Sequence, residues 1–173
     1  MTKEKLQNIV IREYTTTDLP RLTDLWNEIV EGGISFPQEE PLTLKEAEDF
    51  FASQSLTACA FLQNEEGKEE MVGFYILHPN NVGRCAHIAN ASYGVTAKYR
   101  SCGIGRLLVS HCLEMGKKLG FLGLQFNAVV STNLGAIKLY LSLGLEIMAT
   151  IKNGFRLPDG SYVDTLIFFK ALQ

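Results

Sequence analysis

The sequence predicts a mixed α/β sheet in one layered domain. The first observation is the order of elements, because strand-like and helix-like segments follow one another as β-α-α-β-β-β-α-β-α-β-β. The second is the absence of any repeat, linker or low-complexity segment in a chain of 173 residues, a length that suits one domain. We therefore expect a single domain over residues 1–173.

The first half of the chain combines a strand, two helices and a hairpin. Apolar residues recur at helical spacing from Leu22 to Val30, and Gly32-Gly33 ends that helix. Thr43 and Glu46 form a capping-box pattern that opens the second helix. The expected elements are a strand at 7–14, a helix at 17–32, a loop at 34–42, a helix at 43–51, and strands at 56–62 and 71–77 around an acidic turn at 64–70.

The second half alternates strands and helices before a final pair of strands. Apolar residues at steps of three and four follow Gly103, and Gly120 stops this helix. The expected elements are a strand at 87–96, a helix at 103–119, a strand at 121–130, a helix at 132–143, and strands at 145–152 and 162–169.

Composition excludes several classes of function. The net charge of −3 and the lack of a Lys/Arg-rich run give no basic surface for nucleic acid. No apolar stretch reaches the roughly 20 residues that span a membrane, and no signal peptide is visible. The four cysteines form no Cys-x-x-Cys pair, and the three histidines do not cluster with them. We expect a reduced, cytoplasmic protein without a metal.

A glycine turn leads directly into the helix at 103–119. It reads Arg100-Ser-Cys-Gly-Ile-Gly105. The first amides of a helix have no internal partner and its dipole favours negative charge, so glycines there let the backbone approach a phosphate. The same residues also suit a plain tight turn. Two other phosphate motifs fit worse, because no Gly-Lys-[Ser/Thr] follows and Leu108 stands where a dinucleotide fingerprint has Gly or Ala.

Two motifs resemble those of the GNAT acetyltransferase family. Arg100, Gly103 and Gly105 match the cofactor motif Gln/Arg-x-x-Gly-x-Gly/Ala, with Val95 at the strand position five before the Arg. The family's second motif, Asn-x-x-Ala-x-x-Leu-Tyr-x-x-x-Gly-Phe, matches Asn133, Ala136, Leu139, Tyr140 and Gly144. Its one departure is Leu145 for Phe. The resemblance covers the last eighty residues well, and the order of elements fits throughout.

The resemblance implies a mostly antiparallel GNAT-like sheet flanked by helices, with a cofactor-binding core at about 88–145. It implies acetyl-CoA as co-substrate, no metal, and direct transfer to an amine without an acyl-cysteine. In the family the strand near Tyr93 to Val95 splays from its neighbour and pairs with the pantetheine arm. The cofactor contacts implied are Val95, Arg100, Ser101, Cys102, Gly103, Ile104, Gly105, Arg106, Asn133 and Ala136.

Tyr140 occupies the family position whose hydroxyl protonates the departing thiolate. The reference pKa values of a thiol, about 8.5, and a phenol, about 10, suit a short hydrogen bond to the developing sulfur anion. A ring that only packs against the sheet is the alternative. The general base stays open between a carboxylate, a water chain and a histidine. His87 lies just before the central strand and could reach the acceptor side, with a structural hydrogen-bonding role as the alternative. We expect His111 to be structural.

The acceptor side is similar to a narrower group, the yeast acetyltransferases of proline analogues such as azetidine-2-carboxylate. The shared pieces lie around Phe36, His87 and Asn90, with Asn127 before the second motif. By this resemblance Asn90 holds the substrate carboxylate and Asn127 stabilises the tetrahedral intermediate. A primary amide can grip a carboxylate or oxyanion without adding charge. Satisfying backbone groups at strand ends is the structural alternative for both asparagines.

We therefore expect an acetyl-CoA-dependent N-acetyltransferase acting on a small-molecule amine, with an amino acid or a toxic amino-acid analogue as the narrower interpretation. Alternatives are a protein or peptide acceptor and a non-catalytic acetyl-CoA sensor. Phosphinothricin-like and aminoglycoside acceptors also stay open, since Glu39 and Glu40 could attract a cation. The oligomeric state is undecided, with a homodimer among the options.

Overall fold

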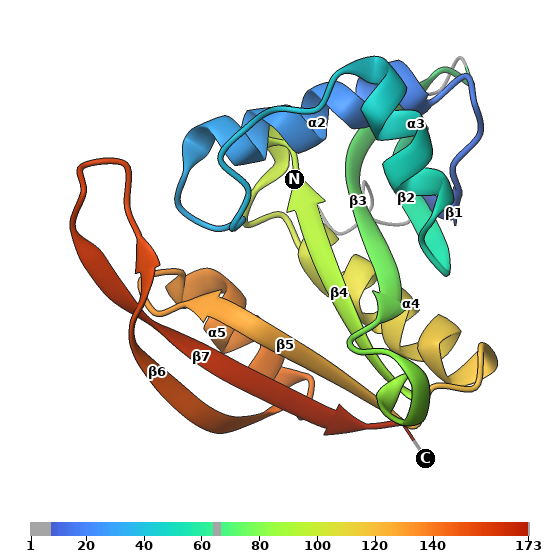
Figure 1. Ribbon diagram of the computed structural model, residues 1–173. Helices are drawn as coiled ribbons and strands as arrows, with labels where there is room; N and C mark the ends of the chain where they lie inside the picture. The colour runs from blue at the N-terminus through green and yellow to red at the C-terminus, as the bar shows by residue number, and fades with distance from the viewer. Residues whose placement is uncertain (1–7, 64–66, 173) are drawn as a thin grey trace.

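The computed structural model describes residues 8–63 and 67–172, and within them it confirms a mixed, mostly antiparallel sheet. Seven strands lie in the order β1-β2-β3-β4-β5-β7-β6 (Figure 1). Every neighbouring pair is antiparallel except β4 and β5, which are parallel. The strands are β1 (Ile9–Glu13), β2 (Leu56–Gln63), β3 (Glu69–Pro79), β4 (Ile88–Val95), β5 (Gly123–Val130), β6 (Glu146–Arg156) and β7 (Tyr162–Ala171).

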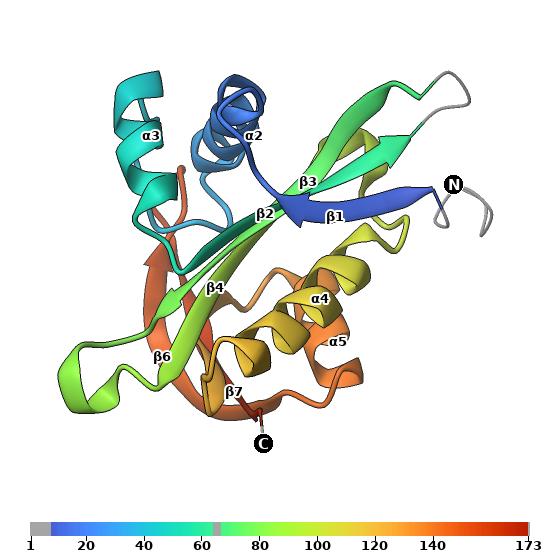
Figure 2. The same ribbon diagram turned by 90° about the vertical axis from the view of Figure 1, so that its right-hand side faces the viewer.

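Helices cover both faces of the sheet (Figure 2). On one face lie α2 (Leu19–Gly32) and α3 (Leu44–Ala52), and on the other lie α4 (Ile104–Lys118) and α5 (Leu134–Ser142). Each face has its own group of buried side chains. Trp26, Phe51 and Phe74 belong to the group on the α2–α3 face, and Leu108 and Phe168 to the group on the α4 face. No helix in the described ranges is long and apolar enough to cross a bilayer.

The helix ends follow the local signals in the sequence. α2 ends at Gly33, whose φ of 61° lies in the left-handed region that glycine adopts without strain. At α3 the Thr43 hydroxyl accepts from the Glu46 amide, and the Glu46 carboxylate accepts from the Thr43 amide at 2.9 Å. The predicted capping box is confirmed.

β4 and β5 pair only at their beginnings. The register joins Ile88 to Gly123 and Ala89 to Leu124, and beyond these residues no pairing continues. Figure 1 shows the two strands starting together and then diverging. On its other edge β4 stays paired with β3 as far as Val95. The splayed strands predicted from the family resemblance are therefore present, and the backbone edge of β4 that faces β5 is left open.

The last hairpin is longer than its sequence indicated. The strand expected at 145–152 runs on to Arg156 through an irregularity between Ile151 and Phe155. There Asn153 has a φ of 53°, and its amide donates to the Asp164 carboxylate at 3.1 Å. Lys152-Asn153-Gly154 thus stands opposite Asp164 alone, and the pairing resumes at Phe155. Gln7 of the first expected strand and residues 64–66 of the acidic turn lie outside the described residues.

Candidate active site

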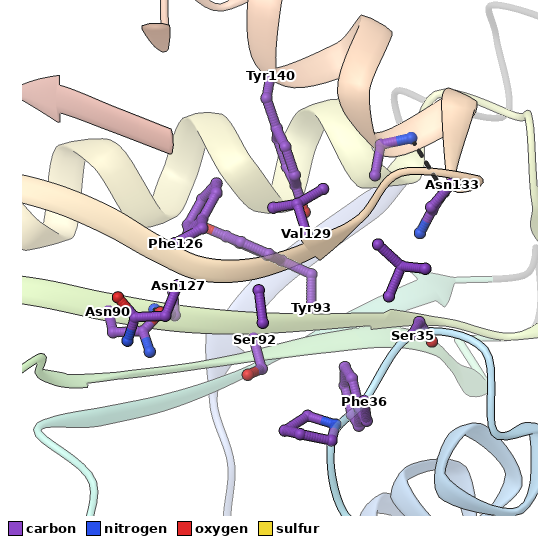
Figure 3. Close-up of a pocket in the computed structure, with 15 residues that line it drawn as sticks. Ser35, Phe36, Asn90, Ser92, Tyr93, Phe126, Asn127, Val129, Asn133 and Tyr140 are labelled. Carbon is purple, nitrogen blue, oxygen red and sulfur yellow. Dashed lines mark hydrogen bonds between the residues drawn. The ribbon is translucent and has the colours of Figure 1, made fainter. Parts of the chain in front are cut away.

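A cavity of about 230 Å³ lies where β4 and β5 diverge. Its walls come from the loop after α2, from β4 and β5, and from the first turns of α5. Figure 3 shows Tyr140 reaching from α5 into this space, which Asn90 from β4 and Asn127 from β5 also line. The cavity brings together six residues that the sequence singled out from separate segments: Phe36, Asn90, Asn127, Asn133, Ala136 and Tyr140.

A second, wider cavity of about 850 Å³ adjoins the first on the α2–α3 face of β3 and β4. The two share Pro37, Asn90 and Ser92, so Asn90 stands at their junction. Trp26 forms an aromatic wall, with its ring centroid 4.7 Å from that of Phe36 and 4.8 Å from that of Phe50. The other end is closed by the loop at 79–86.

The two cavities are lined without formal charge. Among the residues that the structure places in their walls there is no Asp, Glu, Lys or Arg. The titratable side chains in the lining are Tyr93, Tyr140 and His78. A ligand in these cavities would therefore meet neutral hydrogen-bonding groups and apolar surface.

Tyr140 is half-buried among aromatic rings. Its ring centroid lies 4.6 Å from that of Phe126 and 5.6 Å from that of Phe168. Burial raises the pKa of Tyr140 above the usual 10, with a smaller contribution from the nearby Cys112 thiol. The hydroxyl therefore keeps its proton at neutral pH and is suited to donate it.

Asn90 presents its amide nitrogen to the cavities because its oxygen is already bonded. Asn90 Oδ1 accepts from the backbone amide of Ala91 at 2.8 Å. The Thr96 amide donates to Val72 O in β3. Along an antiparallel pair every second residue bonds to the neighbouring strand, so the residues between them point their backbone groups the other way. The backbone groups of Ala91, Tyr93 and Val95 therefore face the open side toward β5. The splay thus frees the Ala91 amide, and this amide fixes the Asn90 side chain.

Asn127 is held on both sides of its amide. Its Oδ1 accepts from Gln125 Nε2 at 2.8 Å, and its Nδ2 donates to Asn80 Oδ1 at 2.5 Å. It lies in an irregularity of β5, where the register with β7 shifts between Phe126 and Val129. Such a bulge turns a side chain away from regular alternation. Among the described residues Asn127 Nδ2 has one acceptor, Asn80 Oδ1, so its second hydrogen is available to a ligand in the cavity that Asn127 lines.

The glycine turn offers consecutive backbone amides at the start of α4. Ser101 and Gly103 have φ values of 59° and 91°, and the helix has no side-chain cap. In the part of the chain that the structure describes, none of the amides from Ser101 to Gly105 donates to a turn or cap acceptor. Their arrangement suits an anion such as a pyrophosphate. Arg100 is exposed beside them.

Other predicted cofactor residues have additional structural roles. The Arg106 amide donates to Gly103 O at 3.1 Å, and its guanidinium donates to Ser142 Oγ at 2.7 Å. Gly105 lets α5 approach, since a Cβ there would lie 3.3 Å from Leu139 Cδ2. Asn133 caps α5, its Oδ1 accepting from the Ala136 amide at 3.2 Å (Figure 3).

The structure places His78, rather than His87, in the lining of the wide cavity. His87 is exposed and belongs to neither cavity lining, and its contact with the substrate stays a prediction. His78 lines the wide cavity and pairs directly with Asn90 across β3 and β4. Sequence reasoning missed His78 because its position beside Asn90 follows from the pairing of β3 with β4. Glu39, considered as an attractor of cations, is paired with Arg156 of the last hairpin.

Comparison with known proteins agrees with this geometry. The model of the Acetyltransferase (GNAT) family matches residues 19–145. The N-acetyltransferase aca1 of Schizosaccharomyces pombe is 32% identical over 163 residues, which cover 87% of this chain and 78% of that protein. A GCN5-related N-acetyltransferase from Kribbella flavida has 30% identity and a TM-score of 0.86, covering 96% of this chain and 99% of the other.

A phosphinothricin acetyltransferase from Sinorhizobium meliloti, solved in complex with acetyl-CoA, shares the fold with a TM-score of 0.85 at 20% identity; the match covers 95% of this chain and 88% of that one. The chain belongs to the GNAT acetyltransferase family. It is an acyltransferase, an acetyl-CoA-dependent N-acetyltransferase.

Proposed function

We propose that this chain acetylates the amine of a small molecule that also carries a carboxylate, such as an amino acid or an amino-acid analogue. The observation that carries the proposal is the junction at Asn90. Its oxygen is bonded to the Ala91 amide, so the two N–H groups remain for a ligand at the point where both cavities meet. A carboxylate accepts such a pair of donors well.

The walls of the wide cavity also favour this acceptor class. They combine uncharged polar groups with the aromatic surface of Trp26 and Phe50. A polycation such as an aminoglycoside or a polyamine would be desolvated there without a carboxylate to pair with. A compact zwitterion brings only one amine, and this amine gives up its proton before it reacts.

The other cavity and the glycine turn suit the acetyl donor. The amides from Ser101 to Gly105 would hold its pyrophosphate, and the open edge of β4 at Tyr93 and Val95 would pair with its pantetheine arm. When bound, acetyl-CoA supplies an activated thioester carbonyl. Arg100 is placed to add positive charge beside the phosphates.

Two residues would then serve the transfer itself. The Tyr140 hydroxyl, kept protonated by burial, would donate its proton to the departing sulfur. The remaining hydrogen of Asn127 Nδ2 would stabilise the oxyanion of the tetrahedral intermediate. Because Gln125 and Asn80 fix the Asn127 amide beforehand, little reorganisation would be needed.

A screen of coenzyme A release tests the proposal. The purified chain would be supplied with acetyl-CoA and with amino acids, azetidine-2-carboxylate, polyamines, aminoglycosides or short peptides. We expect turnover with amino acids or proline analogues and little with polycations. Turnover with peptides alone would make the protein a peptide acetyltransferase, and acetyl-CoA binding without any release would make it a sensor.

Asn90 provides the specific control for carboxylate recognition. Asn90→Ala should raise KM about tenfold or more for a carboxylate-bearing acceptor, because it removes the two N–H donors. The same variant should change KM much less for the matching amino-acid amide, which lacks the carboxylate. An equal loss for both acceptors would remove carboxylate binding from the proposal.

A further inference from the structure

We propose that His78 is the general base that takes the proton from the acceptor amine. This inference rests on the proposed transfer to an amine and assigns the one role that the sequence left open. Among the described side chains lining the two cavities, the titratable ones are His78, Tyr93 and Tyr140. Imidazole alone among these types has a reference pKa near neutrality.

The neighbourhood of His78 fixes which ring nitrogen is free. His78 Nδ1 lies 2.9 Å from the carbonyl oxygen of Pro79. A carbonyl can only accept, so Nδ1 carries the hydrogen and Nε2 of the neutral ring keeps its lone pair. The imidazole is therefore held in the tautomer that a base at Nε2 requires.

The register of the sheet places this base next to the residue that would bind the carboxylate. His78 and Asn90 are direct partners in the β3–β4 pair, and both line the wide cavity. Side chains of directly opposed residues begin about 5 Å apart. In an α-amino acid the carboxylate and the amine are joined through one carbon, so a ligand held at Asn90 has its amine within reach of His78.

Among the described residues of the cavity walls, no Asp, Glu, Lys or Arg competes with His78 for this proton. The segments around His78 contribute uncharged groups to the cavity wall: Trp26 from α2, Phe50 from α3, Gln54 just after α3, Ile76 from β3, and Asn90 and Ser92 from β4. Charged or titratable side chains of the same elements and of the adjoining loop lie exposed and outside the lining, among them Glu28, Glu48, Asp49, Arg84 and His87.

The proton balance of the transfer is then complete. His78 Nε2 accepts one proton from the ammonium group of the acceptor, and the resulting neutral amine attacks the thioester carbonyl carbon. The C–N bond forms and the C–S bond breaks. A second amine proton passes to the thiolate through the Tyr140 hydroxyl, so the products are the amide, the coenzyme A thiol and a protonated His78, which returns its proton to solvent.

The test is the pH dependence of kcat/KM for the acceptor, measured with saturating acetyl-CoA on the full chain and on His78→Gln. Glutamine keeps hydrogen-bonding groups but cannot titrate. We expect a fall of about a hundredfold near neutral pH. The acid limb due to imidazole should disappear, and the residual rate should rise with pH as the acceptor amine itself deprotonates. Acetyl-CoA affinity, measured by calorimetry, should stay close to that of the original chain.

His87→Gln is the rival variant, since the sequence alone pointed to that residue. Loss of the acid limb in His87→Gln, or an unchanged profile in His78→Gln, would overturn the inference. If His78→Gln does not bind acetyl-CoA, His78→Asn replaces it with the same readout. Turnover with peptides only would refute the small-molecule proposal, yet the pH profile on that peptide would still decide the role of His78; no turnover with any acceptor would refute both.

Discussion

At the scale of single residues, the side chains of the site differ in what holds them in place. Asn90 is fixed by one backbone amide, Asn127 by two side chains, and Tyr140 by aromatic packing. A residue held by packing can lose a polar atom without moving. For this reason Tyr140 allows a clean separation of chemistry from structure.

Tyr140→Phe should lower kcat about a hundredfold while the affinity for acetyl-CoA stays nearly the same. The ring contacts with Phe126 and Phe168 remain in the variant, and only the proton donor is removed. Because burial raises the pKa of Tyr140, kcat of the original enzyme should also show no decline from loss of this acid up to pH 10. Steady-state kinetics with calorimetric binding would check both points, and an unchanged kcat in Tyr140→Phe would leave the ring as packing alone.

The residues that sequence reasoning located are those whose type and spacing carry the information. Gly103, Gly105, Asn133 and Tyr140 stand in short motifs, so their positions could be read directly. His78 could not be found in this way, because its place beside Asn90 depends on the register of two strands. The hydrogen bond from Asn127 in β5 to Asn80 in the loop after β3 could not be predicted either, because the two residues are 47 positions apart in the chain.

At the scale of elements, local signals predicted where helices begin and end, whereas contacts between elements required the structure. Gly105 illustrates the difference: its motif predicted an anion turn, but its second effect is the close approach of Leu139 from α5. The divergence of β4 from β5 likewise has no local pattern, and was expected only from the family resemblance. α3 shows the opposite case, because its capping box was legible and also stabilises a wall of the wide cavity.

Thr43→Ala should lower the free energy of unfolding by about 1 kcal/mol, with a fall in Tm of about 3 °C. The change removes the side-chain acceptor for the Glu46 amide and opens the reciprocal bond. Thr43→Ser keeps the hydroxyl and serves as the matched control. Thermal unfolding followed by circular dichroism would measure both, and equal Tm values for the Ala and Ser variants would show that the box contributes nothing.

At the scale of the whole molecule, the two faces of the sheet carry different parts of the candidate site. The face under α4 and α5 carries the glycine turn and Tyr140, and the face under α2 and α3 carries the wide cavity. Asn90 connects them through the gap between β4 and β5. Buried side chains of α2, among them Trp26, pack this helix on the sheet, and Arg12 on β1 adds an ion pair with Asp18 at the start of α2.

Asp18→Asn tests that connection through its pH dependence. Burial opposes the ionisation of Asp18, but hydrogen bonds from Arg12 at 2.7 Å and from Thr15 at 2.8 Å outweigh it, so the pKa of Asp18 is lowered. A carboxyl group with a lowered pKa stabilises the fold above its unfolded value near 3.9, and this stabilisation is lost as the pH falls through the folded value. Asp18→Asn should therefore cost about 2 kcal/mol at pH 7.

The difference between Asp18→Asn and the original chain should shrink as the pH falls from about 4 through the lower pKa of folded Asp18, because the carboxylate is protonated first in the unfolded chain and then in the folded one. Urea unfolding at a series of pH values would measure it. Asp24→Asn, an exposed change on the same helix, is the control and should stay within about 0.5 kcal/mol of the original at each pH. A penalty for Asp18→Asn that stayed constant down to pH 2 would mean that packing of the side chain, rather than its charge, joins α2 to β1.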